Sequence, residues 1–555
     1  MKDACYRLMS MTIHYLSSFS FVGLIVAFVF CSISLSPSLL PRPIYLQALL
    51  SSFCLLAGYG LGVLLHSLWC YLQLPELKGR GRLYLQVVVV IVCVLSYLIN
   101  IFYFEQWQNS VRSLMNMSEV EDASLVYMSC MSLILSALLL SLVRLIKRAF
   151  FIIRSRLVRV LPTRLANVIG VLLLSFFVFS ITNDYFIKKG VEALDEIYAL
   201  ADATSDQGKG LPLRHGASGS SESVIKWHEI GRQGQNFASS GPTLIDLVNL
   251  YGKEAKQPLR IYVGLRSAET YDQRADLALQ EMIRINAFSR SKLIIATPTG
   301  TGWLDESAVD SLEYLHAGDT AIVAMQYSYL PSWLTLLVDP SAARESSAAL
   351  YRKVHEYWSA LPEQERPELY LFGLSLGALA AETSVNLATI INNPIQGALF
   401  AGAPFPSSVS PRLIRNRQVD SPAWLPVIQE ASMVRFTAQE NQLRNNTTWH
   451  WGEIRIVYIQ YASDPMVFFS LDLLNREPDW LKGERGPDVS PDLTWYPLIT
   501  FMQLLFDLPM ADKVPRGSSH NYSASSYIDA WIEVTQPLLL NSEVEERVRK
   551  LFYER

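Results

Sequence analysis

Long apolar stretches make up the first third of the chain. Between Arg7 and Arg42 there are 34 residues without Lys, Arg, Asp or Glu. That is more than the roughly 20 helical residues needed to cross the hydrocarbon core of a bilayer. We therefore predict an α-helical membrane domain over residues 1–190 with about five spans, near residues 15–35, 44–71, 83–104, 123–143 and 165–183.

A polar, partly Ser/Gly-rich segment follows, and we interpret residues 191–245 as a linker because such composition favours flexible connections. After this segment, short runs of apolar residues, which are typical of buried strands, alternate with stretches of helical periodicity. This alternation predicts an α/β domain over residues 246–555 with a mostly parallel sheet. The predicted strands are residues 259–265, 292–297, 320–326, 369–372, 397–401 and 454–460.

Two further segments stand out in this second domain. Residues 404–453 are inserted between two predicted strands and contain three tryptophans, so we interpret them as a cap-like insertion. Residues 493–508 are strongly apolar but too short to span a bilayer. We expect them to form a core helix, with docking at the membrane interface or an acyl-chain groove as the alternatives.

The charges are distributed unequally. The chain has 47 Lys and Arg against 51 Asp and Glu. Before residue 191 there are 16 Lys and Arg and 7 Asp and Glu, whereas the rest of the chain has 31 Lys and Arg and 44 Asp and Glu. Every second loop of the membrane domain is basic, and basic loops stay on the cytoplasmic side during insertion. The charges therefore predict a cytoplasmic-membrane protein with its N-terminus inside and residues after 190 on the extracytoplasmic side.

Composition also excludes several classes of protein. A mean hydropathy of +0.20 is too high for a fully soluble or disordered chain. All six cysteines precede residue 131, which excludes a disulfide framework or a cysteine-ligated zinc later in the chain. The acidic second domain is a poor partner for nucleic acid. We expect no metal and no cofactor, and the sequence leaves the protein partners unknown.

The sequence GLSLG at residues 373–377 fits the motif G-x-S-x-G, in which a nucleophilic serine occupies a tight turn between a strand and a helix. An apolar run precedes the motif and an Ala-rich helical run follows it, as the motif requires. Ser375 is therefore the candidate nucleophile, with Gly373 and Gly377 flanking it. The alternative interpretation is a helix-capping serine.

A serine needs an imidazole to accept its proton and a carboxylate to orient that imidazole, in the chain order Ser, acid, His. Only His450 and His520 follow Ser375. We choose His520, which lies in a loop of small residues, and interpret His450 as a packed histidine between two tryptophans. Asp464 is the candidate acid because it comes directly after a predicted strand.

An oxyanion needs two backbone N–H donors, one after the nucleophile and one from a loop after an earlier strand. Leu376 supplies the first in this prediction. The loop after residues 292–297 contains Gly300 and Gly302, whose small size allows close approach of a substrate. We nominate Thr299, Gly300 or Thr301 as the second donor; the alternative is an ordinary glycine turn.

These residues resemble a bacterial family of membrane-anchored α/β-hydrolases, in which a multi-span region precedes a serine hydrolase domain. The resemblance covers residues 262–522 well and the membrane region in outline. It rests on VGLRSAETYDQRADLAL, ATPTGTGW, LEYLHAGDTAIVAMQYSYLPSW, GLSLGA and the surroundings of Asp464 and His520. The resemblance implies an α/β-hydrolase fold and hydrolysis of an ester in an envelope lipid such as aminoacyl-phosphatidylglycerol.

Our leading hypothesis is a membrane-tethered serine esterase that cleaves a membrane-lipid ester through an acyl-enzyme. Two alternatives stay open: an acyltransferase that uses the same triad on an envelope lipid or glycan, and a non-catalytic scaffold or transporter.

Overall fold

The computed structural model describes residues 18–75, 79–120, 124–180, 188–204, 216–385, 391–444 and 449–553. The chain divides into two compact units. Unit 1 comprises Met1–Phe186, Ser470–Leu481 and Val489–Met510, and unit 2 comprises Ile187–Phe469, Lys482–Asp488 and Ala511–Arg555. Two short segments from the second half of the chain thus fold with the N-terminal helices.

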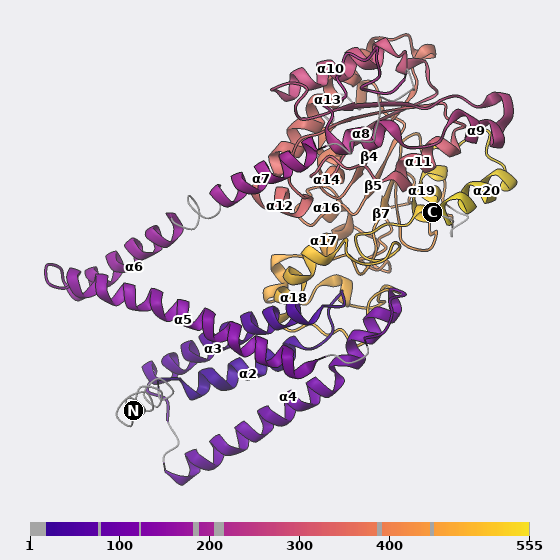
Figure 1. Ribbon diagram of the computed structural model, residues 1–555. Helices are drawn as coiled ribbons and strands as arrows, with labels where there is room; N and C mark the ends of the chain where they lie inside the picture. The colour runs from indigo at the N-terminus through magenta and orange to yellow at the C-terminus, as the bar shows by residue number, and fades with distance from the viewer. Residues whose placement is uncertain are drawn as a thin grey trace. The chain divides into compact units, whose positions relative to one another are not determined.

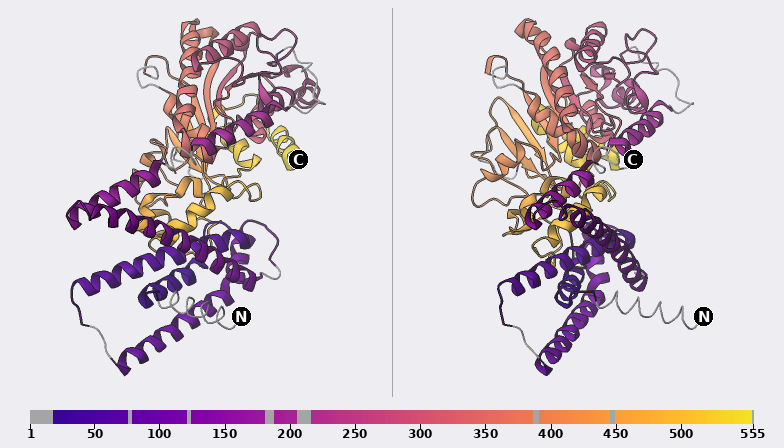
Figure 2. Two further views of the ribbon diagram at one scale, coloured as in Figure 1. Left: turned by 60° about the vertical axis from the view of Figure 1, so that its left-hand side comes forward. Right: turned by 90° about the vertical axis from the view of Figure 1, so that its left-hand side faces the viewer.

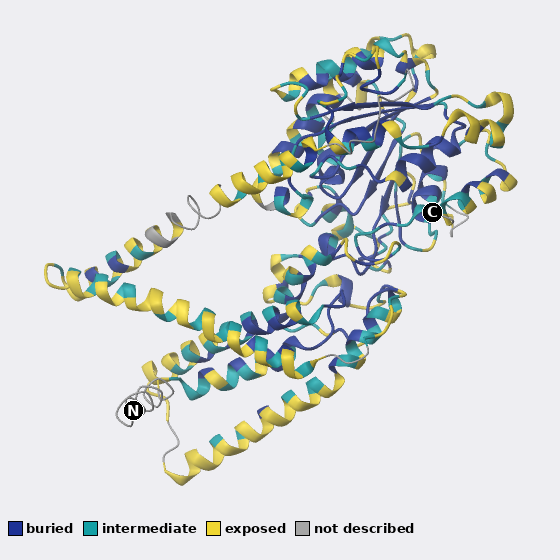
Figure 3. Ribbon diagram, in the orientation of Figure 1, coloured by how far each residue is buried: buried dark blue, intermediate teal, exposed yellow. Residues whose placement is uncertain are grey.

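Unit 1 is helical. Among the described residues, its helices from the N-terminal part of the chain are α2 (Phe21–Ser34), α3 (Ile44–Tyr71), α4 (Arg80–Leu114), α5 (Leu125–Leu157) and α6 (Thr163–Ser180) (Figure 1). Three of them, α3, α4 and α5, are long and apolar enough to cross a membrane. Many large apolar residues of α4 and α5 are exposed, and most of both helices is coloured as exposed or intermediate in Figure 3. Such a surface suits a lipid environment.

The prediction of five spans is wrong for the described residues. Helix α2 has 14 residues, a rise of about 21 Å, which is less than the roughly 30 Å hydrocarbon core. The Ser20 hydroxyl accepts from the Gly23 N–H and caps this helix, so the regular backbone begins there. Within α6 the apolar part covers Thr163–Phe176 and is also short. Residues 15–17 and 181–183 of the predicted spans lie outside the described residues.

Small residues allow α2 and α3 to pack closely. A Cβ atom at Gly62 would lie 2.8 Å from the Gly23 Cα, and one at Gly58 would lie 2.7 Å from the Val26 oxygen. Glycine at both positions therefore permits backbone contact between the two helices, as in many membrane helix pairs.

The apolar segment 493–508 forms α18 (Ile499–Asp507), which packs within unit 1. Ile499 shares a buried cluster with Leu50 and Cys54 of α3. The Gln503 amide donates to the Ser36 carbonyl at 3.0 Å, and Asp507 accepts from the Ser38 hydroxyl. The preferred expectation of a core helix agrees with this arrangement, although the core is that of unit 1.

A seven-stranded sheet forms the centre of unit 2, with strand order β1-β3-β2-β4-β5-β7-β6 and every neighbouring pair parallel. The strands are β1 (Leu259–Val263), β2 (Lys292–Thr297), β3 (Thr320–Met325), β4 (Glu368–Leu374), β5 (Gly397–Ala401), β6 (Val434–Thr437) and β7 (Arg455–Ile459). The four strands β1, β2, β3 and β5 are buried along their whole length, as expected of a parallel sheet covered on both faces.

Helices cover the two faces of this sheet (Figures 1 and 2). Helices α10, α13 and α14 pack on one face, and α8, α11 and α19 on the other. The helices of unit 2 longer than three residues are α7 (Lys188–Ala203), α8 (Gly231–Ser239), α9 (Leu244–Tyr251), α10 (Tyr271–Arg284), α11 (Glu306–Leu315), α12 (Ser332–Val338), α13 (Pro340–Ala360), α14 (Leu376–Ser384), α16 (Ser410–Arg415), α17 (Pro465–Phe468), α19 (Ala524–Thr535) and α20 (Ser542–Tyr553).

Two segments differ from their predicted structure. The predicted linker 191–245 contains α7, α8 and the start of α9, and Ser218 donates its N–H to the Arg260 oxygen beside β1; residues 205–215 lie outside the described part. The predicted cap 404–453 contributes the edge strand β6. Its four residues were too few to stand out in the hydrophobic pattern.

Candidate active site

Ser375 lies at the sharp turn between β4 and α14. Its backbone angles are φ 57° and ψ −127°, a left-handed conformation that a non-glycine residue rarely adopts. The Ser375 N–H donates to the Ala401 oxygen at 2.9 Å, which fixes the turn against the end of β5. Strain of this kind at a serine between a strand and a helix is typical of a nucleophile turn.

Gly373 and Gly377 make this turn possible. A Cβ atom at Gly373 would lie 2.4 Å from the Gly377 oxygen, and one at Gly377 would lie 2.2 Å from the Thr297 oxygen. Both distances are far below van der Waals contact, so any larger residue would displace the backbone. A side chain at Gly373 would collide with the turn itself, and one at Gly377 with the end of β2.

Asp464 and His520 form a hydrogen-bonded pair, although they are 56 residues apart. The His520 Nδ1 lies 2.6 Å from the Asp464 Oδ2, and the Asp464 side chain is fully buried. Asp464 follows β7 and caps α17, whose Met466 N–H donates to the other carboxylate oxygen at 2.8 Å. A carboxylate held in this way fixes the orientation and tautomer of the imidazole.

The other ring nitrogen of His520, Nε2, is buried and has no hydrogen-bond partner among the described residues. The ring lies beside Gly402, where a Cβ atom would be 2.6 Å from the His520 Cε1. Gly402 comes one residue after Ala401, which pairs with Leu374 in the register of β4 and β5. The imidazole therefore stands at the strand ends where Ser375 lies, with a nitrogen able to accept a proton.

Tyr522 is a residue that the sequence did not single out. Its hydroxyl donates to the Asp464 Oδ2 at 2.6 Å, the same oxygen that faces His520. Burial raises the pKa of the Tyr522 phenol well above its usual range, with the charge of Asp464 as a further cause, so the phenol keeps its proton. In the sequence, only its position two residues after His520 could have suggested a role at the site.

A second buried carboxylate supports both members of the pair. The Asp488 Oδ2 accepts from the Ser463 hydroxyl at 2.6 Å, and the Ser463 oxygen accepts from the Ser519 N–H at 3.0 Å. Ser463 and Ser519 immediately precede Asp464 and His520. Burial raises the pKa of Asp488. The burial of Asp488 depends on segments that are distant in sequence, so the sequence did not single it out.

The proposed oxyanion donors have different environments. Leu376 is the first residue of α14, where helix N–H groups have no partner within the helix. The Thr299 N–H donates to the Trp303 oxygen at 2.9 Å, and the Gly300 N–H donates to the Ser332 hydroxyl at 2.9 Å. Either group would have to exchange this bond for a substrate oxygen, which leaves Leu376 and Thr301 as the simpler candidates.

His450 is exposed, so its interpretation as a packed histidine was wrong. The neighbouring Trp451 is held elsewhere: its indole N–H donates to Glu533 at 2.9 Å, and the Arg435 guanidinium lies 3.8 Å from its ring centre. Arg435 thus stacks on Trp451, whereas the His450 side chain is exposed to solvent.

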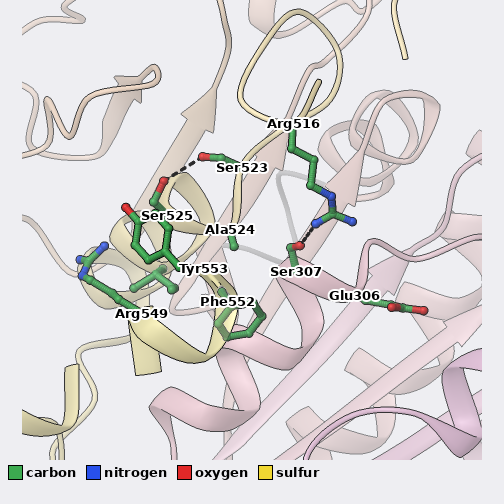
Figure 4. Close-up of a pocket in the computed structure, with 10 residues that line it drawn as sticks. Glu306, Ser307, Arg516, Ser523, Ala524, Ser525, Arg549, Phe552 and Tyr553 are labelled. Atoms are coloured by element: carbon green, nitrogen blue, oxygen red, sulfur yellow. Dashed lines mark hydrogen bonds between the residues drawn. The ribbon is translucent and has the colours of Figure 1, made fainter. Parts of the chain in front are cut away.

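A cavity of about 430 Å³ opens at another place on unit 2 (Figure 4). It lies between the starts of α11 and α19 and the end of α20. The Arg516 guanidinium points across it to the Ser307 hydroxyl, and Ser523 and Ser525 are hydrogen-bonded at 2.9 Å (Figure 4). Ser375, Asp464 and His520 are not among its lining residues, so this cavity has no part in the chemistry of the pair.

Among the described residues, no group of three His, Cys, Asp or Glu side chains could hold a metal ion. The chemistry available at the ends of β4, β5 and β7 is that of a strained serine, an oriented imidazole and a buried carboxylate.

Two family models match the chain. Residues 259–548 match the model described as "Alpha/beta-hydrolase family", and residues 35–242 match "Alpha/beta-hydrolase family N-terminus". Comparison with curated proteins and with solved structures gives no significant match. The first model covers more than half of the chain and includes Ser375, Asp464 and His520.

Proposed function

Because the chain belongs to the alpha/beta-hydrolase family, we propose that it is a membrane-tethered serine esterase that hydrolyses an ester of a membrane lipid. The observation that carries this proposal is the 2.6 Å bond between Asp464 and His520 at the strand ends that also bear the strained Ser375. A serine, a histidine and a buried acid so arranged support acyl transfer through a covalent intermediate.

In the proposed reaction the His520 Nε2 accepts the Ser375 hydroxyl proton as the oxygen attacks the ester carbonyl. The N–H of Leu376 donates to the developing oxyanion. Collapse of this intermediate breaks the ester bond, and His520 returns the proton to the departing alcohol. Water then attacks the acyl-enzyme with His520 again as base, which releases the acid and restores Ser375. Asp464 stabilises the imidazolium in both steps.

The membrane unit supports a lipid substrate. Three long apolar helices hold the enzyme at a bilayer, so the substrate is concentrated at the surface where the protein is anchored. An aminoacyl-phosphatidylglycerol is our specific candidate, since its aminoacyl ester is attached to a head group at that surface.

The extracytoplasmic side is supported by the chain path within unit 1. Asp507 contacts the loop between α2 and α3 through Arg42 at 3.7 Å, and Ser490 contacts Ser110 near the end of α4 at 3.1 Å. Residues 489–510 therefore meet the end of the unit opposite to the basic residues 154–164. Since basic segments stay in the cytoplasm, we assign residues 489–510, and the catalytic unit joined to them, to the other side. This assignment requires α6, whose 18 residues rise about 27 Å, to return the chain across the bilayer after α5.

Incubation of the purified full-length protein with lysyl-phosphatidylglycerol in mixed micelles tests the proposal. We expect release of free lysine, and a loss of at least about a thousandfold in rate in Ser375→Ala. Transfer of lysine or of an acyl chain to a second lipid would instead favour the acyltransferase alternative.

A labelled fluorophosphonate separates the nucleophile from the substrate. Reaction at Ser375 without any lipid hydrolysis would overturn the lipid assignment and leave the serine hydrolase intact. Absence of reaction at Ser375 in folded protein would favour the non-catalytic scaffold.

A further inference from the structure

Unit 1 contains a cavity of about 630 Å³ among the start of α2, the middle of α3 and the second half of α5. All of its described lining residues lie between Ser18 and Phe151, so it belongs to unit 1 alone. Apolar side chains such as Leu56, Val63 and Leu140 form much of its wall.

Three cations line the same cavity. Lys147 and Arg148 follow Arg144 on α5 by three and four residues, which places all three on one side of the helix. Helices α2, α3 and α5 contain no Asp or Glu. The walls that these helices form therefore carry positive charge without a carboxylate of their own, and such a site attracts an anion.

Aromatic rings orient two of these cations. The Arg144 guanidinium lies 4.4 Å from the centre of the Phe19 ring, and the Lys147 ammonium lies 6.0 Å from that of Phe151. Phe19 in turn meets Tyr59 edge-on at 5.8 Å, and the Tyr59 hydroxyl accepts from the Ser20 N–H at 3.3 Å. Contacts with ring faces thus help to hold Arg144 and Lys147 in position.

The depth of the cations matches a head-group level. Arg144 comes 19 residues after Leu125, the first residue of α5, a helical rise of about 29 Å. The hydrocarbon core is about 30 Å thick. Leu140 and Val143 precede the cations along α5 and lie within that thickness. A ligand that fills the cavity thus needs an anionic group at one end and apolar chains at the other.

We propose that this cavity binds an anionic phospholipid, with its phosphate at Lys147 and Arg148 and its acyl chains against the α3 and α5 side chains. Basic pockets between membrane helices are known to take anionic head groups. Such a lipid is a ligand of the membrane unit and not a substrate of Ser375, which lies in unit 2. A bound lipid would stabilise the packing of α2, α3 and α5 by mass action.

Native mass spectrometry of the full-length Ser375→Ala protein in detergent, titrated with dioleoyl-phosphatidylglycerol, tests this site. The background variant prevents turnover of the probe. We expect saturable binding of one lipid, and binding at least tenfold weaker in Lys147→Gln/Arg148→Gln. The matched control is Arg156→Gln/Arg159→Gln, which removes two exposed cations from the same region outside the cavity and should bind as the parent does.

Dioleoyl-phosphatidylcholine and soluble glycerol 1-phosphate complete the titration. Weak binding of both is expected, because the first has no net charge and the second has no acyl chains. Equal affinity of the two double variants, or glycerol phosphate bound as tightly as the lipid, would overturn the proposal. Arg148→Gln alone, with an expected intermediate loss, replaces the double variant if the latter is not monodisperse.

Discussion

At the scale of single residues, Asp464 organises the site. One of its oxygens accepts from the Met466 N–H, and the other faces both the His520 ring and the Tyr522 hydroxyl at 2.6 Å. Together these three hydrogen bonds hold the Asp464 carboxylate in one orientation. The chain order and the strand-end location were sufficient to select Asp464 and His520 from the sequence, whereas Tyr522 required the folded loop.

Replacement of Tyr522 by Phe tests this arrangement. The variant removes one donor to the Asp464 Oδ2, so fewer bonds hold the carboxylate that orients His520. We expect kcat to fall by about tenfold with KM nearly unchanged, because only the orientation of the base is affected. Initial rates of ester hydrolysis at several substrate concentrations measure both. An unchanged kcat would mean that Tyr522 has a packing role only.

At the scale of elements, the turn from β4 to α14 was predictable because its constraint is local. Gly373 and Gly377 must be small, and the apolar run before them can only be a buried strand. Strand β6 was not predictable, because its four residues gain their strand character from pairing with β7. Asp488 and the residues after 190 show the same dependence: their burial or helicity results from neighbours that are distant in sequence.

Helix α14 carries a pH-dependent contact. Burial raises the pKa of Glu382 to about 7, and the Tyr458 hydroxyl of β7 donates to this carboxyl at 3.0 Å. The folded protein thus binds the proton more tightly than the unfolded chain, whose pKa is about 4.3. Stability is therefore highest below the unfolded pKa and falls as the pH rises towards 7.

Glu382→Gln should remove this pH dependence. Relative to the wild type, the variant should gain about 5 °C in Tm between pH 5 and pH 8. Thermal unfolding followed by tryptophan fluorescence at both pH values provides the measurement. A difference in Tm that is equal at pH 5 and pH 8 would contradict the assignment of a buried, protonated Glu382.

At the scale of the whole molecule, hydrophobicity separated an apolar helical region from an α/β domain but did not give every boundary. Helices α3, α4 and α5 were recognisable from their length alone, whereas α2 is limited by the cap at Ser20. The apolar segment around α18 looked like a core helix, yet hydrophobicity does not specify which core. Only the fold assigns it to unit 1, where Asp507 meets Arg42 at 3.7 Å with both side chains fully buried.

This ion pair should matter for the stability of unit 1. Arg42→Gln or Asp507→Asn leaves one buried charge without its partner, at a cost of about 3–5 kcal/mol, whereas the double variant should lose less than the sum. Thermal unfolding of the wild type, the two single variants and the double variant in detergent gives the coupling free energy between Arg42 and Asp507. Additive losses would show that the two residues act independently.

The central claim is that Ser375 is a nucleophile activated by His520 and Asp464. Time-resolved mass spectrometry of tryptic peptides after fluorophosphonate treatment tests this most directly. We predict one adduct, on the peptide that contains Ser375, formed at least about a hundredfold more slowly in His520→Ala. An adduct on a different serine, or an equal rate in His520→Ala, would contradict the account.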